Sequence, residues 1–185
     1  VPGETIVKGE DYLPGDGVRR EGEDIVASRF GLADTSDRLI KVIALSGVYI
    51  PRRGNVIIGQ VVDIVHNGWL VDYGGAANAF LSLKEVPRFI NQDEMREQFD
   101  FGDMMVAKVW GVGGRGVDLS VKMHGFGKFD EGMIIKVNPN KVPRVIGKEG
   151  SMVNMIKEAT GCELTVGQNG IIWIQGKTID DELKT

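Results

Sequence analysis

The stretch RVIGKEGSMVNMIKEATGCELTVGQNGIIWIQ, residues 144–175, decides the fold of the C-terminal part of the chain. Gly147 and Gly150 stand three residues apart, with Lys148 between them, directly before an amphipathic pattern. Two such glycines permit a tight turn and leave no Cβ in the path of a group that approaches the helix N-terminus. The pattern predicts a loop that binds a phosphate backbone. The plainer alternative is a tight turn between two helices.

The residues around this loop predict a complete small domain. MIIKV is a strand, residues 140–146 form a short helix, and residues 151–160 form a second helix that Gly161 ends. CELTVG and GIIWIQG then form a hairpin across the Asn-Gly turn at Asn169 and Gly170. The order β-α-GxxG-α-β-β is the KH arrangement.

The motif VIGKEGSMV, residues 145–153, resembles the KH family. In that family the GxxG loop clamps about four nucleotides of a single strand. The resemblance implies that phosphates meet the helix N-terminal amides and Lys148, while Glu149 partly cancels that charge. The implied RNA-binding residues are Arg144, Gly147, Lys148, Glu149, Gly150 and Ser151.

The middle of the chain predicts a five-stranded OB barrel. Its strands are VIIGQVVDIV, GWLVDYG, AFLSL, MMVAKVWGV and VDLSVKM, with a long polar connection between the third and the fourth. GVGGRG at 111–116 matches a dinucleotide motif formally, but a strand follows it where that motif needs a helix. We therefore interpret it as a hairpin turn.

The runs NGWLVDYG, AFLSL and RGVDLSVK resemble the OB-type RNA-binding domain that is repeated in the largest small-subunit ribosomal protein. In that family aromatic residues stack on bases and a basic turn residue reaches the backbone. The resemblance implies that Trp69 and Phe80 stack and that Arg115 is the turn cation. Either aromatic residue can instead be part of the core. Ser82 stands where that family often has histidine, and Asp72 lies close to the same face.

Short β-like runs and the turn PGDG at 14–17 predict a small antiparallel unit at the N-terminus. The fold class is therefore multidomain, mostly β and then α+β. The expected parts are a β-rich unit over residues 1–53, the OB barrel over 54–125, and the KH domain over 126–185. A helix starts near Thr178 but has room for only about two turns. We expect this third KH helix to be truncated and to leave Ile172 and Ile174 less covered.

Composition narrows the function. The single cysteine, Cys162, excludes an internal disulfide and reads as a small core residue, and the chain shows no cluster of metal-ligand residues. No leader or apolar run of about 20 residues is visible, which predicts a cytoplasmic protein without membrane contact. The net charge of −4 has the wrong sign for a free-standing nucleic-acid binder, but residues 136–177 carry 6 basic against 3 acidic residues. Affinity for phosphate is expected to be local.

The combination of the three parts resembles the RNA-binding cap subunit of the archaeal exosome, of the ribosomal RNA processing protein four type. The resemblance implies a non-catalytic protein without cofactors. The resemblance also implies that three copies sit on a ring of ribonuclease-PH-like subunits and guide the 3′ ends of single-stranded RNA into the central pore. The N-terminal unit would contact the ring, with Val7, Tyr12 and Leu13 as candidates. Avidity between copies would then compensate for the negative net charge.

Two other classes of protein stay open. A phosphate-dependent nuclease also combines OB and KH modules, but this chain has no nucleophile elbow, no P-loop and no acidic cluster at metal spacing, and Asp100, Asp103 and Asp118 read as solvated turn charges. The second alternative is a free-standing OB/KH protein that binds RNA in translation or RNA metabolism. A strongly basic tail would favour it, and none is visible.

Overall fold

The structure is a computed structural model that describes residues 1–45, 47–88, 90–114 and 116–185. The chain forms two compact units, Val1–Gly47 and Val48–Thr185, each of which is described by itself. Residues 48–53, which the sequence analysis assigned to the N-terminal part, belong to the second unit, because Tyr49 packs against the core of the barrel.

The N-terminal unit contains two three-stranded sheets. The orders are β1-β4-β3 and β2-β6-β5, and all neighbours are antiparallel except β2 and β6. Ile25 and Ile40 are fully buried and centre its small core. The strands are β1 (Thr5–Lys8), β2 (Leu13–Pro14), β3 (Val18–Glu21), β4 (Asp24–Ala27), β5 (Gly31–Asp34) and β6 (Leu39–Ala44).

The predicted five-stranded barrel is confirmed. Its strands are β7 (Val56–Val65), β8 (Gly68–Asp72), β9 (Ala79–Ser82), β10 (Met104–Gly113) and β11 (Gly116–Ser120). The order is β11-β9-β8-β7-β10, and pairing of β10 with β11 closes the barrel. β12 (Gly127–Lys128) pairs antiparallel with Met105 and Val106 of β10. The long connection between β9 and β10 carries η1 (Leu83–Glu85), η2 (Gln92–Glu94) and α1 (Met95–Gln98). The GVGGRG segment joins the antiparallel strands β10 and β11, so the hairpin interpretation is confirmed.

The KH arrangement is also confirmed. It consists of β13 (Met133–Lys136), η3 (Pro139–Lys141), α2 (Val142–Ile146), η4 (Lys148–Gly150), α3 (Ser151–Thr160), β14 (Glu163–Val166), β15 (Ile171–Gln175) and α4 (Ile179–Lys184). The strand order is β13-β15-β14, with both pairs antiparallel. Thr178 caps α4, since its Oγ1 accepts a hydrogen bond from the Asp181 amide.

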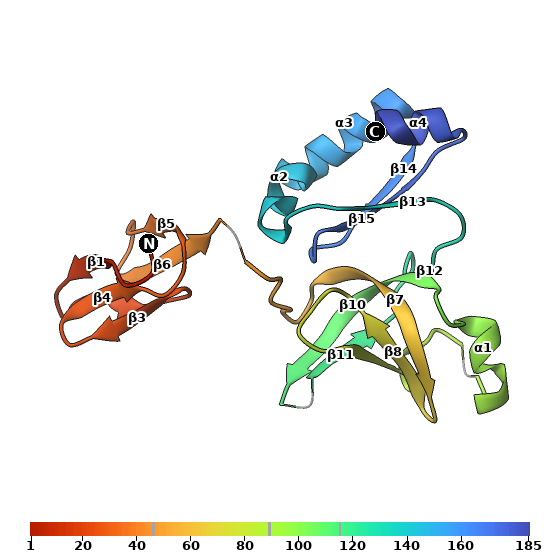
Figure 1. The fold of residues 1–185 in the computed structure, drawn as a ribbon, viewed down its shortest axis with the longest axis horizontal. Coiled ribbons are helices and arrows are strands. Elements are labelled where there is room, and N and C mark those ends of the chain that lie inside the picture. Colours follow the sequence, from red (N-terminus) through yellow and green to blue (C-terminus); the bar gives the residue numbers. More distant parts are fainter. Residues whose placement is uncertain (46, 89, 115) are drawn as a thin grey trace. The chain divides into compact units, whose positions relative to one another are not determined.

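Alternate residues of β15 face opposite sides of the KH sheet. Ile172 and Ile174 pack with Val153 and Ile156 of α3, whereas Ile171 and Trp173 pack against the barrel. The sheet therefore lies between its helices and the barrel (Figure 1). Ile172 and Ile174 are each only 2% exposed, so the expectation that they would be poorly covered is wrong. Cys162 is buried beside them, as the sequence predicted.

The turn between β14 and β15 fastens the KH sheet to the barrel. β8 pairs with β7 only from Gln60 onward, so the preceding residues of β7 have an unpaired edge on that side. Asn169 fills this edge: its Oδ1 accepts from the Ile58 amide at 3.2 Å, and its Nδ2 donates to the carbonyl groups of Ile58 at 2.7 Å and Tyr73 at 2.8 Å. The Gln168 amide donates to the Val56 carbonyl at 2.8 Å. The turn thus replaces a missing strand neighbour.

Apolar packing surrounds this polar contact. Ile58 and Val106 from the outer face of the barrel pack against Ile171 and Trp173 of β15. Phe129, in the connection between the two parts, stacks on Trp173 with ring centroids 4.4 Å apart. The polar lock and the apolar contact together explain why the barrel and the KH sheet behave as one compact unit.

We expect Asn169→Ala to lower the free energy of unfolding by roughly 2–4 kcal/mol, because three buried backbone groups lose their partner. Gln168→Ala is the matched control: its side chain is exposed and accepts one hydrogen bond from the Val56 amide, so the loss should stay below about 1 kcal/mol. Urea denaturation of both variants measures the difference, and equal losses would contradict the lock.

Candidate RNA-binding surface

The GxxG loop lies between α2 and α3 and depends on left-handed backbone. Gly147, Glu149 and Gly150 have φ values of 73°, 55° and 82°. Glu149 is the one non-glycine residue with positive φ among the described residues. Such a conformation costs a residue with a Cβ about 1–2 kcal/mol. Strain of this kind often marks a functional loop.

The two glycines are required for different reasons. A Cβ on Gly147 would lie 2.8 Å from the Met152 amide nitrogen and 2.9 Å from Ser151 Oγ, so a side chain cannot fit there. A Cβ on Gly150 would meet nothing closer than 3.9 Å, so this position needs glycine for its backbone conformation alone. The tight-turn interpretation therefore accounts for Gly147 by packing, whether or not RNA binds.

The side chains of the loop are open to solvent. Arg144, Lys148, Glu149 and Ser151 are all exposed. Neither Arg144 nor Lys148 forms an ion pair with any described residue. The Ser151 amide, however, donates to the Lys148 carbonyl. Of the helix N-terminal amides expected to face a phosphate, the Ser151 amide is thus already used by the tight turn, and the Ser151 hydroxyl is the remaining polar group of that side chain.

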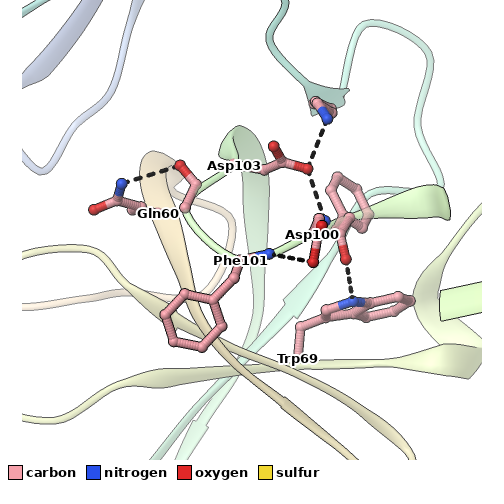
Figure 2. Close-up of polar contacts among 8 residues, drawn as sticks. Gln60, Trp69, Asp100, Phe101 and Asp103 are labelled. Carbon is pink, nitrogen blue, oxygen red and sulfur yellow. Dashed lines mark hydrogen bonds and ion pairs between the residues drawn. The ribbon is translucent and has the colours of Figure 1, made fainter. Parts of the chain in front are cut away.

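The prediction that Trp69 stacks on bases is wrong. Its side chain is 0% exposed in the barrel core, where it contacts Phe99 edge to face with centroids 5.3 Å apart. Trp69 Nε1 donates to the Phe99 carbonyl at 3.0 Å, as Figure 2 shows. Val71 and Leu81 are buried with it, so alternation along β8 and β9 turns these residues inward. The core alternative holds for Trp69.

Phe80 and Leu70 point to the outer face of the barrel instead. They are directly paired across β8 and β9, and both are half-buried. The Phe80 ring covers Gly68, where a Cβ would meet it at 2.8 Å. Three exposed carboxylates flank the pair: Asp63 opposite Leu70, Asp72 on β8, and Asp118 opposite Phe80. Phe80 remains a candidate for stacking, but its surroundings repel phosphate.

The turn before β10 presents a different aromatic residue. Phe101 is 68% exposed, and its amide donates to Asp100 Oδ1 at 2.8 Å. Asp103 accepts from the Asp100 amide and from Lys128 Nζ, both at 2.7 Å, and Gln60 Nε2 donates to the Gly102 carbonyl at 3.0 Å (Figure 2). Burial alone would raise the pKa of Asp103, but the Lys128 contact and the Asp100 amide hold it below its ordinary value. Asp103 is thus a structural turn carboxylate.

The structure brings only part of the predicted site together. Arg144 and residues 147–151 are contiguous on the helical side of the KH sheet, away from the barrel. Trp69 is in the barrel core and Phe80 is on its outer face. Arg115 lies outside the described residues. Within the described part of the chain, no group of three or more potential metal ligands is present, and no helix has the length and apolar character needed to span a membrane.

Comparison with known proteins agrees with both modules. Residues 48–111 match the family model described as RRP4, S1 domain, and residues 132–180 match that of the KH domain. The barrel is therefore of the S1 type. An S1 barrel joined to a KH domain with an exposed GxxG loop defines a protein built from RNA-binding modules.

The relatives identify the family. The chain is 40% identical to exosome complex component Rrp4 of Methanothermobacter thermautotrophicus over 180 residues, 96% of this chain. It is 40% identical to the Pyrococcus abyssi Rrp4 over 96% of this chain and 69% of that protein. A crystal structure described as an exosome complex RNA-binding protein matches with a TM-score of 0.67 and 33% identity, over 74% of this chain and 81% of that one. The chain belongs to the Rrp4 family of exosome components.

The relatives differ in length from this chain. The chain spans 57% of the Methanothermobacter thermautotrophicus protein and 61% of the Methanobrevibacter smithii protein. It spans 82% of the Methanothermus fervidus protein, with 38% identity.

We expect Trp69→Phe to lower the free energy of unfolding by about 2–4 kcal/mol, because it leaves the Phe99 carbonyl unpaired and opens a small cavity. At temperatures where the variant is folded, its affinity for single-stranded RNA should equal that of the unmodified chain. Thermal denaturation and fluorescence anisotropy measure the two quantities. Phe80→Ala is the contrasting variant: it should lose less stability than Trp69→Phe and should bind RNA more weakly than the unmodified chain. A Trp69→Phe variant that is stable but binds RNA poorly would instead support stacking by Trp69.

Proposed function

We propose that this protein is a non-catalytic RNA-binding cap subunit of a cytoplasmic exosome. Three copies would sit on a ring of ribonuclease-PH-like subunits and guide the 3′ ends of single-stranded RNA into the central pore. The observation that carries the proposal is the exposed GxxG loop, with the unpaired Lys148, on a KH domain locked to an S1 barrel in a chain of the Rrp4 family.

The KH loop supplies the contact to the RNA backbone in this proposal. Lys148 and Arg144 bring cations to the phosphates, while Gly147, Glu149, Gly150 and Ser151 shape the loop. The exposed carboxylate of Glu149 lowers the local positive charge. One copy then binds weakly, and several copies around one pore bind RNA tightly through avidity.

The N-terminal unit offers a surface for the ring. Leu32 and Ile43 are directly paired across β5 and β6, and Leu13 and Leu39 are paired across β2 and β6. These four side chains are 50–59% exposed, and Val7 and Tyr12 are only half-buried. The Lys41–Asp34 ion pair lies between these two apolar pairs, and a sheet face with exposed apolar residues on both sides of an ion pair favours a protein partner. Among the candidates from the sequence, Leu13 lies in this face.

The alternative is a free-standing OB/KH protein that acts in translation or RNA metabolism. The apolar face of the N-terminal unit disfavours it, because a monomer gains nothing from such a surface. A phosphate-dependent nuclease of the same module composition would require catalytic groups, and the proposal assigns none to this chain.

Lys148→Ala should weaken binding of a short fluorescent single-stranded RNA by roughly 3- to 10-fold, and should lower the salt slope by about 1, because one phosphate contact is lost. The affinity of the chain for this RNA is measured with and without ring subunits at two salt concentrations. Lys177→Ala, an exposed lysine outside the loop, is the matched control and should change little. Glu149→Gln should strengthen binding. Equal RNA binding with and without the ring would favour the free-standing protein.

Leu32→Ser combined with Ile43→Ser should weaken association with ring subunits by at least tenfold, since each buried aliphatic side chain contributes roughly 1.5–3 kcal/mol. Both residues are exposed in the chain itself, so its fold should be unaffected. Lys8→Ser, an exposed residue in the other sheet of this unit, is the control. Size-exclusion chromatography with the ring measures association, and an unchanged elution of the double variant would refute this docking surface.

A further inference from the structure

Trp110 is the exposed member of the three tryptophans. Its side chain is 54% exposed on β10, whereas Trp69 and Trp173 are 0% and 7% exposed. Met105, Ala107 and Val109 of the same strand are fully buried, so alternation places Trp110 on the outer face of the barrel. The role of this indole is separate from the barrel core and from the KH contact.

A cation lies over the indole ring. The guanidinium carbon of Arg53 is 5.1 Å from the Trp110 ring centroid, within the range of a cation-π contact. Two backbone hydrogen bonds hold the Arg53 segment against β10: the Gly54 amide donates to the Val109 carbonyl, and the Val109 amide donates to the Asn55 carbonyl, both at 2.8 Å. The backbone segments that carry Arg53 and Trp110 are thus hydrogen-bonded side by side.

The side chain of Asn55 fixes the same turn from within. Asn55 Oδ1 accepts from the Arg52 amide at 3.2 Å and from the Tyr49 hydroxyl at 2.7 Å. Burial raises the pKa of Tyr49 to about 12, so the hydroxyl stays a donor at neutral pH. A turn held this way presents Arg53 with little loss of entropy when a ligand binds.

The charge around Trp110 differs from that around Phe80. Lys108, two residues before Trp110, lies on the same outer face, and its Nζ approaches Met123 Sδ at 3.6 Å. Neither Arg53 nor Lys108 forms an ion pair with a described residue. The nearest carboxylate in the strand pairing is Asp118, opposite Gly111. This surface therefore combines one aromatic ring with two cations and borders one carboxylate, Asp118, whereas three carboxylates flank Phe80.

We propose that the Arg53–Trp110 surface, together with Lys108, is a second contact for single-stranded RNA. A base stacks on the indole, and the guanidinium and ammonium groups bind the flanking phosphates. Single-stranded RNA supplies base faces that can stack on the indole and negative charges that can pair with the two cations. The inference rests on the proposed RNA-binding function and adds where on the barrel the RNA lies.

Binding of a fluorescent oligoadenylate to the full chain, alone and with ring subunits, tests the site. Trp110→Ala should weaken binding roughly 5- to 150-fold, Trp110→Phe should restore most of the affinity, and Arg53→Ala should weaken binding and its salt dependence. Phe101→Ala is the matched control, because Phe101 is equally an exposed aromatic residue but stands between Asp100 and Asp103. Its affinity should be unchanged.

Intrinsic tryptophan fluorescence gives a signal of RNA binding that does not depend on the stability of the variant. RNA should quench the Trp110 emission and shield it from iodide, and this response should vanish in Trp110→Phe, because Trp69 and Trp173 are buried. If the chain binds RNA but both Trp110→Ala and Arg53→Ala bind equally well, this site is refuted while the proposed function stands. If ring subunits alone shield the indole, the surface is a protein interface and the inference fails. If no RNA binds under any condition, the proposed function itself fails.

Discussion

The contact of Asn169 with the edge of β7 is the constraint on which the second unit depends. A strand edge without a neighbour exposes amide and carbonyl groups that need a hydrogen bond to either water or another partner. One asparagine side chain satisfies both groups of Ile58 and a carbonyl of Tyr73, because an amide offers a donor and an acceptor on the same plane. The KH turn thereby closes the barrel's open edge, and apolar residues on both sides bury the contact. The orientation of the KH sheet, and with it the direction in which the GxxG loop points, follows from this lock.

Local signals explain most of what the sequence predicts correctly. The strand and helix order, the GxxG loop and the hairpin turns each depend on residues close together in the chain, such as Gly147 and Gly150 or Asn169 and Gly170. The Asn-Gly pair reads correctly as a turn between β14 and β15. Its second role, to pair with a strand more than a hundred residues earlier, leaves no local signal. Contacts of that kind become visible only in the folded chain.

The aromatic residues show the same limit. Trp69 and Trp110 look alike in the sequence, since each lies in a β-rich run after glycine or valine, yet one is buried and the other is exposed. Which one faces out depends on strand register, and β7 and β10 each contain an irregularity that shifts it. Val71, two residues after Trp69 on β8, and Leu81, opposite Trp69 on β9, are both buried. Because buried and outward residues alternate along a strand, these neighbours indicate that Trp69 faces inward. The pattern NGWLVD, read by alternation from Val71, already favours an inward Trp69.

The distribution of charge reconciles a net charge of −4 with RNA binding. Acidic side chains cluster on faces where they hold turns or flank Phe80, as Asp100, Asp103 and Asp118 do. Among the described residues, the cations that form no ion pair include Arg144 and Lys148 at the KH loop, and Arg53 and Lys108 beside Trp110. If RNA binds as proposed, carboxylates elsewhere on the surface repel a strand that approaches in a wrong position, and the two cationic surfaces attract it. In the proposed cap, a small number of contacts per copy would also allow the strand to move through the pore, because each phosphate contact is weak enough to break and reform.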